Sequence, residues 1–255
     1  MNEYYFNSLT LAWTLFAIAL IPIQIKVTAP YGRHMRSNWG LSIGNRLGWT
    51  IMEVVSLLVF SFFFLRGEGI KSTGSWILFS LWAAHYVHRS LIFPWRTRTR
   101  GKMIPLFIVF SAVFFNSING FLNGFYLGEW QGAPIDPGHP RFIAGLLIFI
   151  FGAALNLYSD TILLHLRKPG ETGYKIPQNS LFRFVSCPNL LGEIIEWTGF
   201  ALMAWNPAAL SFAVWTAANL IPRALSHHRW YKEQFPEYPV ERKAVIPFCF
   251  VKSEG

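Results

Sequence analysis

An acid and a phenol stand inside two apolar stretches of the sequence. Glu53 lies in GWTIMEVVSLLVF, and Tyr86 lies near the end of SLWAAHYV. Apolar surroundings favour the protonated form of a carboxyl group, which then donates a hydrogen bond as a phenol does. Two such donors aimed at one carbonyl oxygen would polarise a ketone or an enone, as an oxyanion hole does. Taken singly, Glu53 is explained by an interhelical hydrogen bond and Tyr86 by ordinary aromatic packing.

Other polar residues recur in the sequence at helical spacing. Three sets each fall on roughly one face of a helix. They are Asn156, Asp160 and Arg167; Asn189, Glu193 and Glu196; and Arg223, His227 and Tyr231. If the helices cross a membrane, such residues normally face the bundle interior and mark a site. We therefore predict a polar cavity, and the alternative is that these groups only tie helices together by hydrogen bonds.

The elements that must position these residues are membrane helices. Hydrophobic residues make up 53% of the 255 positions and charged residues 14%, against about 25% charged in a soluble domain. The first apolar stretch has no basic run before it and no cleavage site, so we expect a retained span. We predict one all-α membrane domain over 1–255, a seven-helix bundle. Its spans are 6–24, 48–65, 74–94, 103–127, 142–164, 190–205 and 208–224, followed by a tail over 225–255.

The connections between the predicted spans alternate in charge. Loops 25–47, 95–102 and 165–189 sum to +4, +4 and +3, whereas loops 66–73, 128–141 and 206–207 sum to +1, −1 and 0. By the positive-inside rule the basic loops and the tail are cytoplasmic, and the N-terminus is outside. The polar cavity would then face the cytoplasm. The membrane would be the inner membrane if the protein is bacterial, or that of the endoplasmic reticulum if it is eukaryotic. The break at Asn206-Pro207 predicts a tight helical hairpin.

Several other kinds of site are not expected. No G-x-G-x-x-G follows a predicted strand, and no G-x-x-x-x-G-K-[ST] occurs. His227 and His228 are neighbours that point in different directions on a helix, so we expect no metal site. Cys187 and Cys249 lie far apart, so no disulfide is expected. Two explanations fit the net charge of +9. The basic residues either set the membrane topology and attract anionic lipid, or they bind an anionic ligand. We expect no nucleic-acid partner.

Longer segments of the sequence carry a family resemblance. They are NLYSDTILLHLRKPGETGYKIP (156–177), GEIIEWTGFALMAW (192–205) and HHRWYKEQFPEYPVERKAVIPFCF (227–250), with YGRHMRS (31–37), Trp49 and HYVHRS (85–90) upstream. Together they resemble the steroid 5α-reductases, or 3-oxo-5α-steroid 4-dehydrogenases. These are membrane enzymes that reduce the C4–C5 double bond of 3-oxo-Δ4 steroids with NADPH. The resemblance covers nearly the whole chain and is strongest over 141–251.

This resemblance implies a role for each set of residues. Glu53 and Tyr86 match the catalytic pair that hydrogen-bonds the steroid C3 carbonyl, and Trp49 accompanies them in the substrate site. The positions that match NADPH-binding residues are Asn156, Asp160, Arg167, Tyr174, Asn189, Glu193, Arg223, His227 and Tyr231, with the basic residues Arg89, Arg100 and Lys102. The chain departs from the family pattern at Leu164 and Lys175, where arginine is common in relatives.

The implied reaction is hydride transfer from NADPH to the steroid C5. One alternative is a reductase of another lipid enone, such as a polyprenol or an enoyl thioester. A second is an isoprenylcysteine-type methyltransferase, which would need neither the acid–phenol pair nor so much phosphate-binding charge. A third is a seven-span receptor or transporter, which would bind a ligand without consuming a cofactor. We expect a monomer whose partners are NADPH, membrane lipid and a steroid or steroid-like substrate.

Overall fold

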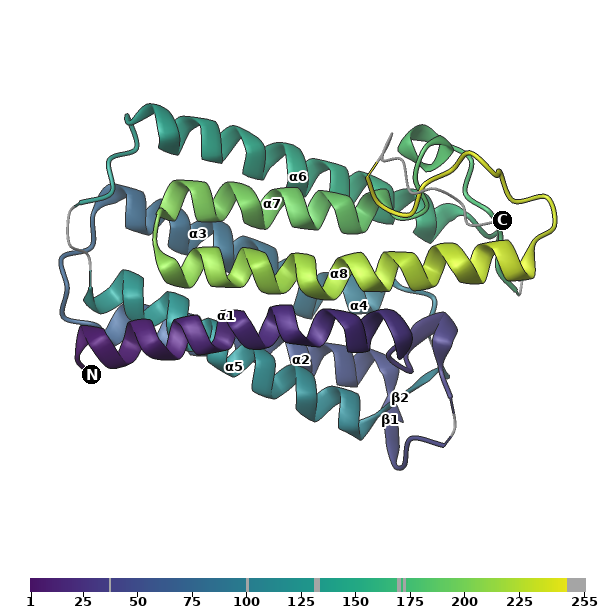
Figure 1. Ribbon diagram of the computed structural model, residues 1–255, viewed down its shortest axis with the longest axis horizontal. Coiled ribbons are helices and arrows are strands. Elements are labelled where there is room, and N and C mark those ends of the chain that lie inside the picture. Colours follow the sequence, from purple (N-terminus) through teal and green to yellow (C-terminus); the bar gives the residue numbers. More distant parts are fainter. Residues whose placement is uncertain (37, 100, 131–133, 169–170, 172, 247–255) are drawn as a thin grey trace.

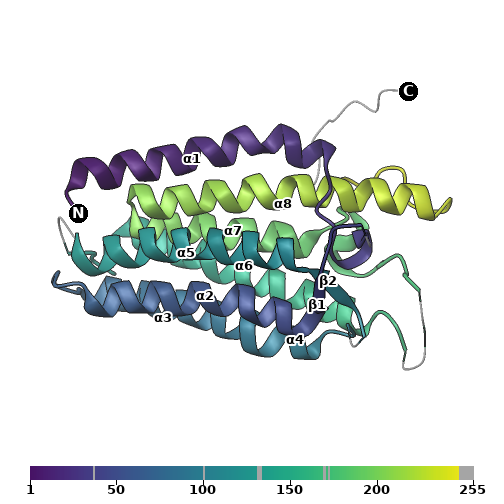
Figure 2. The same ribbon diagram turned by 90° about the horizontal axis from the view of Figure 1, so that it is seen from below.

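The computed structural model is a bundle of long helices that run back and forth along one axis (Figure 1). It describes residues 1–36, 38–99, 101–130, 134–168, 171 and 173–246. The long helices are α1 (Glu3–Lys26), α2 (Asn45–Arg66), α3 (Thr73–Val87), α5 (Leu106–Glu129), α6 (Pro140–His165), α7 (Pro188–Ala204) and α8 (Pro207–Gln234). α6 packs along α7, α2 along α5, and α1 along α8 at the outer edge of the bundle (Figure 2). The all-helical prediction is confirmed.

Each predicted span overlaps one of these helices, although span 74–94 runs beyond the end of α3 and span 103–127 begins before α5. Among the described residues, α1, α2, α5, α6 and α8 are long and apolar enough to cross a membrane, whereas α3 has 15 residues and α7 has 17. These helices make the chain an integral membrane protein, and the count of seven spans stays a prediction. The tight hairpin is confirmed, because α8 follows α7 after two residues and the Asn206 side chain accepts from the backbone N–H of Ala209 at 2.9 Å.

The helix of the last predicted span continues beyond residue 224, where the span is expected to end. α8 continues to Gln234, so the first part of the predicted tail is helical. The residues SHHRWYKEQ contain no glycine or proline, and the helix ends just before Pro236, which cannot continue it. The extension carries His227 and Tyr231 on the helix, as their spacing required.

The helical path of α3 widens near its end. α3 runs into a π-helical segment, η2 (His88–Ile92), and then into α4 (Phe93–Arg96). Pro94 has no backbone N–H, so the carbonyl of Ser90 loses its helical partner. The hydroxyl of Thr50 on α2 donates to that carbonyl instead, at 3.0 Å. The widened turn carries Arg89, and such π segments are frequent at functional sites.

Two short strands lie at the same end of the bundle as η2 and α4 (Figure 1). β1 (Ser42–Gly44) pairs antiparallel with β2 (Met103–Pro105), with Ile43 opposite Ile104. The pair joins the two basic loops that precede α2 and α5. The sequence does not predict these strands, because three residues are too few to show an alternating pattern.

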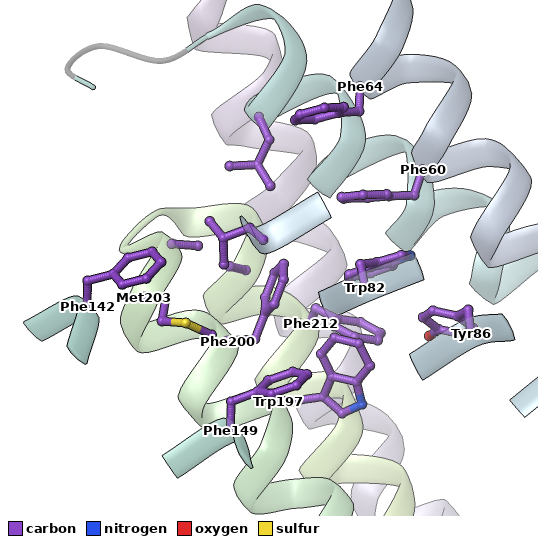
Figure 3. Close-up of a cluster of buried hydrophobic side chains, with 14 residues drawn as sticks. Phe60, Phe64, Trp82, Tyr86, Phe142, Phe149, Trp197, Phe200, Met203 and Phe212 are labelled. Atoms are coloured by element: carbon purple, nitrogen blue, oxygen red, sulfur yellow. The ribbon is translucent and has the colours of Figure 1, made fainter. Parts of the chain in front are cut away.

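A cluster of aromatic side chains fills the interior between α2, α3, α7 and α8 (Figure 3). Trp82 stacks on Phe60 with ring centroids 4.5 Å apart and meets Trp197 edge-on at 5.1 Å. Tyr86 lies at the edge of this cluster, 5.2 Å from the Trp82 ring (Figure 3). Such pairs favour defined geometries, so the cluster fixes where Tyr86 is presented.

α6 and α7 are in main-chain contact through glycines. A Cβ added at Gly152 would lie 2.6 Å from the carbonyl oxygen of Gly192, and one added at Gly192 would lie 2.7 Å from that of Gly152. Gly145 and Gly199 approach each other in the same way further along the helices. Small residues let membrane helices approach this closely, and the contact sets the polar stripes of α6 and α7 side by side.

Candidate active site

A cavity of about 340 Å³ lies at the end of the bundle that carries β1 and β2. It falls within the usual size range of small-molecule sites, roughly 300–1,000 Å³. Its lining includes eleven of the residues that the sequence predicted: Trp49, Arg89, Lys102, Asp160, Arg167, Tyr174, Asn189, Glu193, Arg223, His227 and Tyr231. The predicted polar cavity is therefore present, and the three polar stripes converge on it.

A buried polar network joins η2, α6 and α7 on one side of the cavity. Asn156 donates to the carbonyl oxygen of Asn189 at 3.0 Å and lies 3.4 Å from a carboxylate oxygen of Glu193. The Asn189 side chain donates to Asp160 Oδ1 at 2.9 Å. Arg89 reaches to 3.5 Å from Glu193 and 3.8 Å from Asp160. Asn156 thus lies behind the cavity wall and supports it through hydrogen bonds. The guanidinium of Arg89 offsets the negative charges of Asp160 and Glu193.

The opposite side of the cavity is closed by residues 28–36, here called the strap. Arg223 on α8 donates to the carbonyl oxygens of Ala29 and Tyr31, both at 2.8 Å. Its guanidinium also lies over the Tyr31 ring, 3.8 Å from the centroid. A single buried arginine therefore holds the strap against α8.

Two histidines form a second link between the strap and α8. His34 Nε2 lies 2.9 Å from His227 Nδ1, so one imidazole donates and the other accepts. Burial lowers the pKa of His34 to about 4, and the neighbouring cation of Arg223 adds to this effect. His34 is therefore neutral at physiological pH. His228 turns away and shares a hydrogen bond with Ser186 at 2.7 Å, as expected for adjacent helical residues.

Arg33 of the strap sits in an aromatic cage. Its guanidinium lies 5.4, 4.9 and 4.6 Å from the ring centroids of Tyr174, Trp230 and Tyr231. Cation–π contact of this kind stabilises a charge away from water. Arg33 Nη1 is buried and has no hydrogen-bond partner among the described residues, so a donor remains for a ligand.

The cavity is strongly cationic. Its described lining holds the basic residues Arg33, Arg89, Arg98, Lys102, Arg167 and Arg223 against the acids Asp160 and Glu193. Asp160 Oδ2 is buried and, within the described chain, accepts no hydrogen bond. A ligand with several phosphates and some hydroxyl or amide donors fits this set of groups. Arg100, predicted to join them, lies outside the described residues.

The predicted catalytic pair lies beyond the cavity wall. Glu53 and Tyr86 are absent from the described lining, whereas Trp49, one helical turn before Glu53, is part of it. The charged group that acts most strongly on the Tyr86 phenol is Glu53. Among the charged groups that act on the Glu53 carboxyl group, Arg89 has the strongest effect and Glu193 the next strongest. Glu53 and Tyr86 are therefore near enough to interact electrostatically with each other and with Arg89 and Glu193 of the cavity wall.

Comparison with known proteins gives a consistent picture. A family model described as 3-oxo-5-alpha-steroid 4-dehydrogenase matches residues 102–250. The chain is 41% identical over 251 residues to the steroid 5-alpha-reductase DET2 of Gossypium hirsutum, covering 93% of this chain and 95% of the relative. It is 40% identical to 3-oxo-5-alpha-steroid 4-dehydrogenase 1 of Bos taurus, covering 87% and 88%. The Homo sapiens protein of that name is 39% identical, covering 86% of both chains.

The chain belongs to the steroid 5α-reductase family. It is therefore an oxidoreductase of a family of steroid-acting enzymes, and the isoprenylcysteine methyltransferase and receptor alternatives are set aside. The two positions at which the resemblance predicts a departure from the family pattern lie in different surroundings. Leu164 lines the cavity, so a different residue there would alter the wall itself. Lys175 instead donates to Glu171 at 2.6 Å, which lowers the pKa of that exposed carboxyl group.

The cavity is also lined by residues that were not predicted from the sequence to belong to the site. Arg33 and Arg98 line the cavity, as do Tyr31, Asn45 and Cys187. Arg33 and Arg98 stand in basic loops that the sequence analysis had assigned to membrane orientation. In the sequence, only their positive charge indicated that Arg33 and Arg98 could belong to a ligand site. Only the docking of the strap on α8, and the contact of Arg98 with the carbonyls of Arg167 and Lys168, shows that both loops face the cavity.

Proposed function

We propose that this protein reduces the C4–C5 double bond of 3-oxo-Δ4 steroids, with NADPH as the hydride donor. One observation carries the proposal. Glu53 and Tyr86 interact electrostatically with each other and with Arg89 and Glu193, which line a cavity that holds six described basic residues. Relatives about 40% identical over most of the chain are named as steroid 5α-reductases or 3-oxo-5α-steroid 4-dehydrogenases. The names of the relatives support the substrate class, and the absence of Glu53 and Tyr86 from the described cavity lining supports two separate binding regions.

The cavity would hold the cofactor by its charges. Arg33, Arg98, Lys102 and Arg167 at the loop side would bind phosphate groups, because guanidinium and ammonium groups pair strongly with phosphate oxygens. The network of Asp160, Asn189 and Glu193 lies deeper and would bind uncharged donors of the ribose and the carboxamide. NADPH, when bound, supplies the hydride that adds to C5 of the steroid.

Glu53 and Tyr86 would act on the substrate carbonyl. Glu53 has no hydrogen-bond partner among the described residues, so a protonated Glu53 can donate to the C3 oxygen together with the Tyr86 phenol. As hydride reaches C5, electron density moves onto that oxygen. Preorganised donors in a dry site stabilise this developing charge. Trp49 on the same face of α2 would border the steroid where it meets the cofactor.

The orientation in the membrane is part of the proposal. The basic loops lie at the cavity end, so by the positive-inside rule this end faces the cytoplasm and the N-terminus lies outside. All seven long helices would cross the bilayer, with α3 extended through η2 and α4. NADPH would enter from the cytoplasm, and the steroid would enter from the lipid. The working unit would be a monomer.

Turnover by the purified protein tests the proposal. NADPH oxidation is followed in detergent with and without testosterone or progesterone, and the product is analysed. Steroid-dependent oxidation that yields a 5α-reduced product supports the proposal. Oxidation that occurs only with a polyprenol or an enoyl thioester would contradict the substrate class. Absence of NADPH binding would contradict the assignment of the cationic cavity.

A further inference from the structure

α3 and α7 are linked by a second polar pair, one turn deeper than the cavity wall. Arg89 and Glu193, which line the cavity, lie 3.5 Å apart. Four residues before Arg89, His85 Nδ1 lies 2.7 Å from Oε1 of Glu196, three residues after Glu193. The side chains of His85 and Glu196 are only 7% and 3% exposed. Two rungs therefore follow one another inward from the cavity. The outer rung is the pair Arg89–Glu193, and the deeper rung is the pair His85–Glu196.

The deeper rung is held in one geometry. His85 meets the Trp197 ring at 4.6 Å and the Tyr86 ring at 5.0 Å. Glu196 is fixed from behind, because Gly152 of α6 lies against its backbone. A carboxylate bound to Nδ1 fixes the imidazole orientation and favours the imidazolium. Nε2 of His85 has no hydrogen-bond partner among the described residues. The N–H at Nε2 can therefore donate to a ligand.

The reduction described above needs a proton at C4, and this inference rests on that proposed function. C4 is bonded to C3, whose oxygen would be held by Glu53 and Tyr86. The proton donor must therefore lie beside that pair. His85 adjoins Tyr86 in the chain and in space, and it is one of the charged groups that act on Glu53. The other charged groups around His85 are Glu196 and Glu193 of α7 and Arg89 of η2.

We propose that His85, held by Glu196, is the catalytic acid that protonates C4. Hydride addition at C5 breaks the C4=C5 π bond and leaves an enolate across C4, C3 and the C3 oxygen. The Nε2–H bond of the imidazolium then breaks as the C4–H bond forms, and the C3 carbonyl is restored. Water from the cavity returns a proton to the neutral imidazole past the Arg89–Glu193 rung. The net reaction consumes one hydride and one proton from water.

The test compares His85→Asn with wild type. Asparagine keeps a hydrogen-bond donor where Nδ1 stood but has no proton to give at neutral pH. We expect kcat to fall by about 100-fold, a usual loss for a general acid, with the steroid KM unchanged. We expect the solvent deuterium isotope effect on kcat to rise, because protonation becomes rate-limiting. His165→Asn is the matched control, since His165 is exposed and, among the described residues, bonds only its own helix at Thr161.

A second variant keeps the inference testable if His85→Asn fails to fold. In Glu196→Gln we expect the alkaline fall in kcat to move to lower pH, because the amide no longer stabilises the imidazolium. An unchanged kcat and isotope effect in a folded His85→Asn protein, or an unchanged pH profile in Glu196→Gln, would overturn the assignment of His85 alone. A wild-type protein that reduces no 3-oxo-Δ4 steroid would overturn the proposed function and, with it, this inference.

Discussion

The two sides of the cavity are built on different physical principles. The α6–α7 side depends on main-chain contact, with Gly152 and Gly192 each against the other's carbonyl oxygen. The strap–α8 side depends on side chains, chiefly the bonds of Arg223 to two carbonyls and the His34–His227 pair. The glycine contact of the first side is made of uncharged main-chain atoms, although Asp160 and Glu193 bond across the same helices. The second side is made of groups that bind protons or anions.

This difference assigns the two sides different tasks. Main-chain contact tolerates no added atom, so it holds Asp160, Asn189 and Glu193 at fixed separations whatever the pH or ligand. Side-chain contacts can exchange partners, and Arg223 also lines the cavity. We expect variants of the glycine side to lose the folded protein, and variants of the strap side to lose cofactor affinity first.

The largest effect is expected from Gly152→Leu. The atoms next to an added Cβ are main-chain atoms of Gly192 and Glu196, which cannot move aside. Overpacking in a tight core costs about 1–3 kcal/mol and sometimes more, and we expect this site to reach the upper end. Thermal melting in detergent measures it. Gly44→Leu is the control, because a Cβ there meets nothing within 4 Å, and equal melting temperatures would refute the contrast between the two sides.

Glu53 belongs to neither side, and its variants should affect turnover alone. We expect Glu53→Ala to lower kcat by roughly 100-fold, as loss of one oxyanion donor does. Glu53→Gln keeps a donor and should lose less. Neither variant should change the NADPH affinity or the melting temperature. Steady-state kinetics with varied steroid measure this, and equal losses in the two variants would contradict the role of Glu53 as a neutral donor.

Arg223→Gln sharpens the comparison on the strap side. Loss of the two bonds to Ala29 and Tyr31 should loosen the strap and remove one cavity charge. We expect the KM for NADPH to rise about tenfold, or about 1.4 kcal/mol, with the steroid KM unchanged. Arg229→Gln is the matched control, because Arg229 is exposed on the same helix and bonds Ile25. A larger change in the steroid KM than in the NADPH KM would count against this placement.

The smallest effect concerns pH. His34 has a pKa of about 4 in the folded protein against 6.5 for an ordinary histidine. Between these values the unfolded chain binds more protons than the folded one, so stability should fall as pH drops from about 6.5 towards 4. His34→Gln should reduce this loss. Melting temperatures at pH 7 and pH 5 compare the two proteins, and the same loss in both would exclude His34 as a source.

The sequence by itself determined the long helices and eleven of the residues that line the cavity. Apolar runs near span length locate the seven long helices, and the spacing of Asp160, Glu193 and His227 assigns each to a helix face. These are local properties of the chain, because one helical turn relates neighbours three and four residues apart. The family resemblance added the role of the Glu53–Tyr86 pair, which spacing alone left open between chemistry and packing.

Only the tertiary structure decided how these faces meet. It showed that the strap lies on α8, that Arg98 reaches the loop after α6, and that Glu196 faces His85 while Glu193 faces the cavity. Each contact joins residues far apart in sequence, where no periodicity links one partner to the other. The glycine contact of α6 with α7 sets the separations, and side-chain packing then selects which polar groups pair.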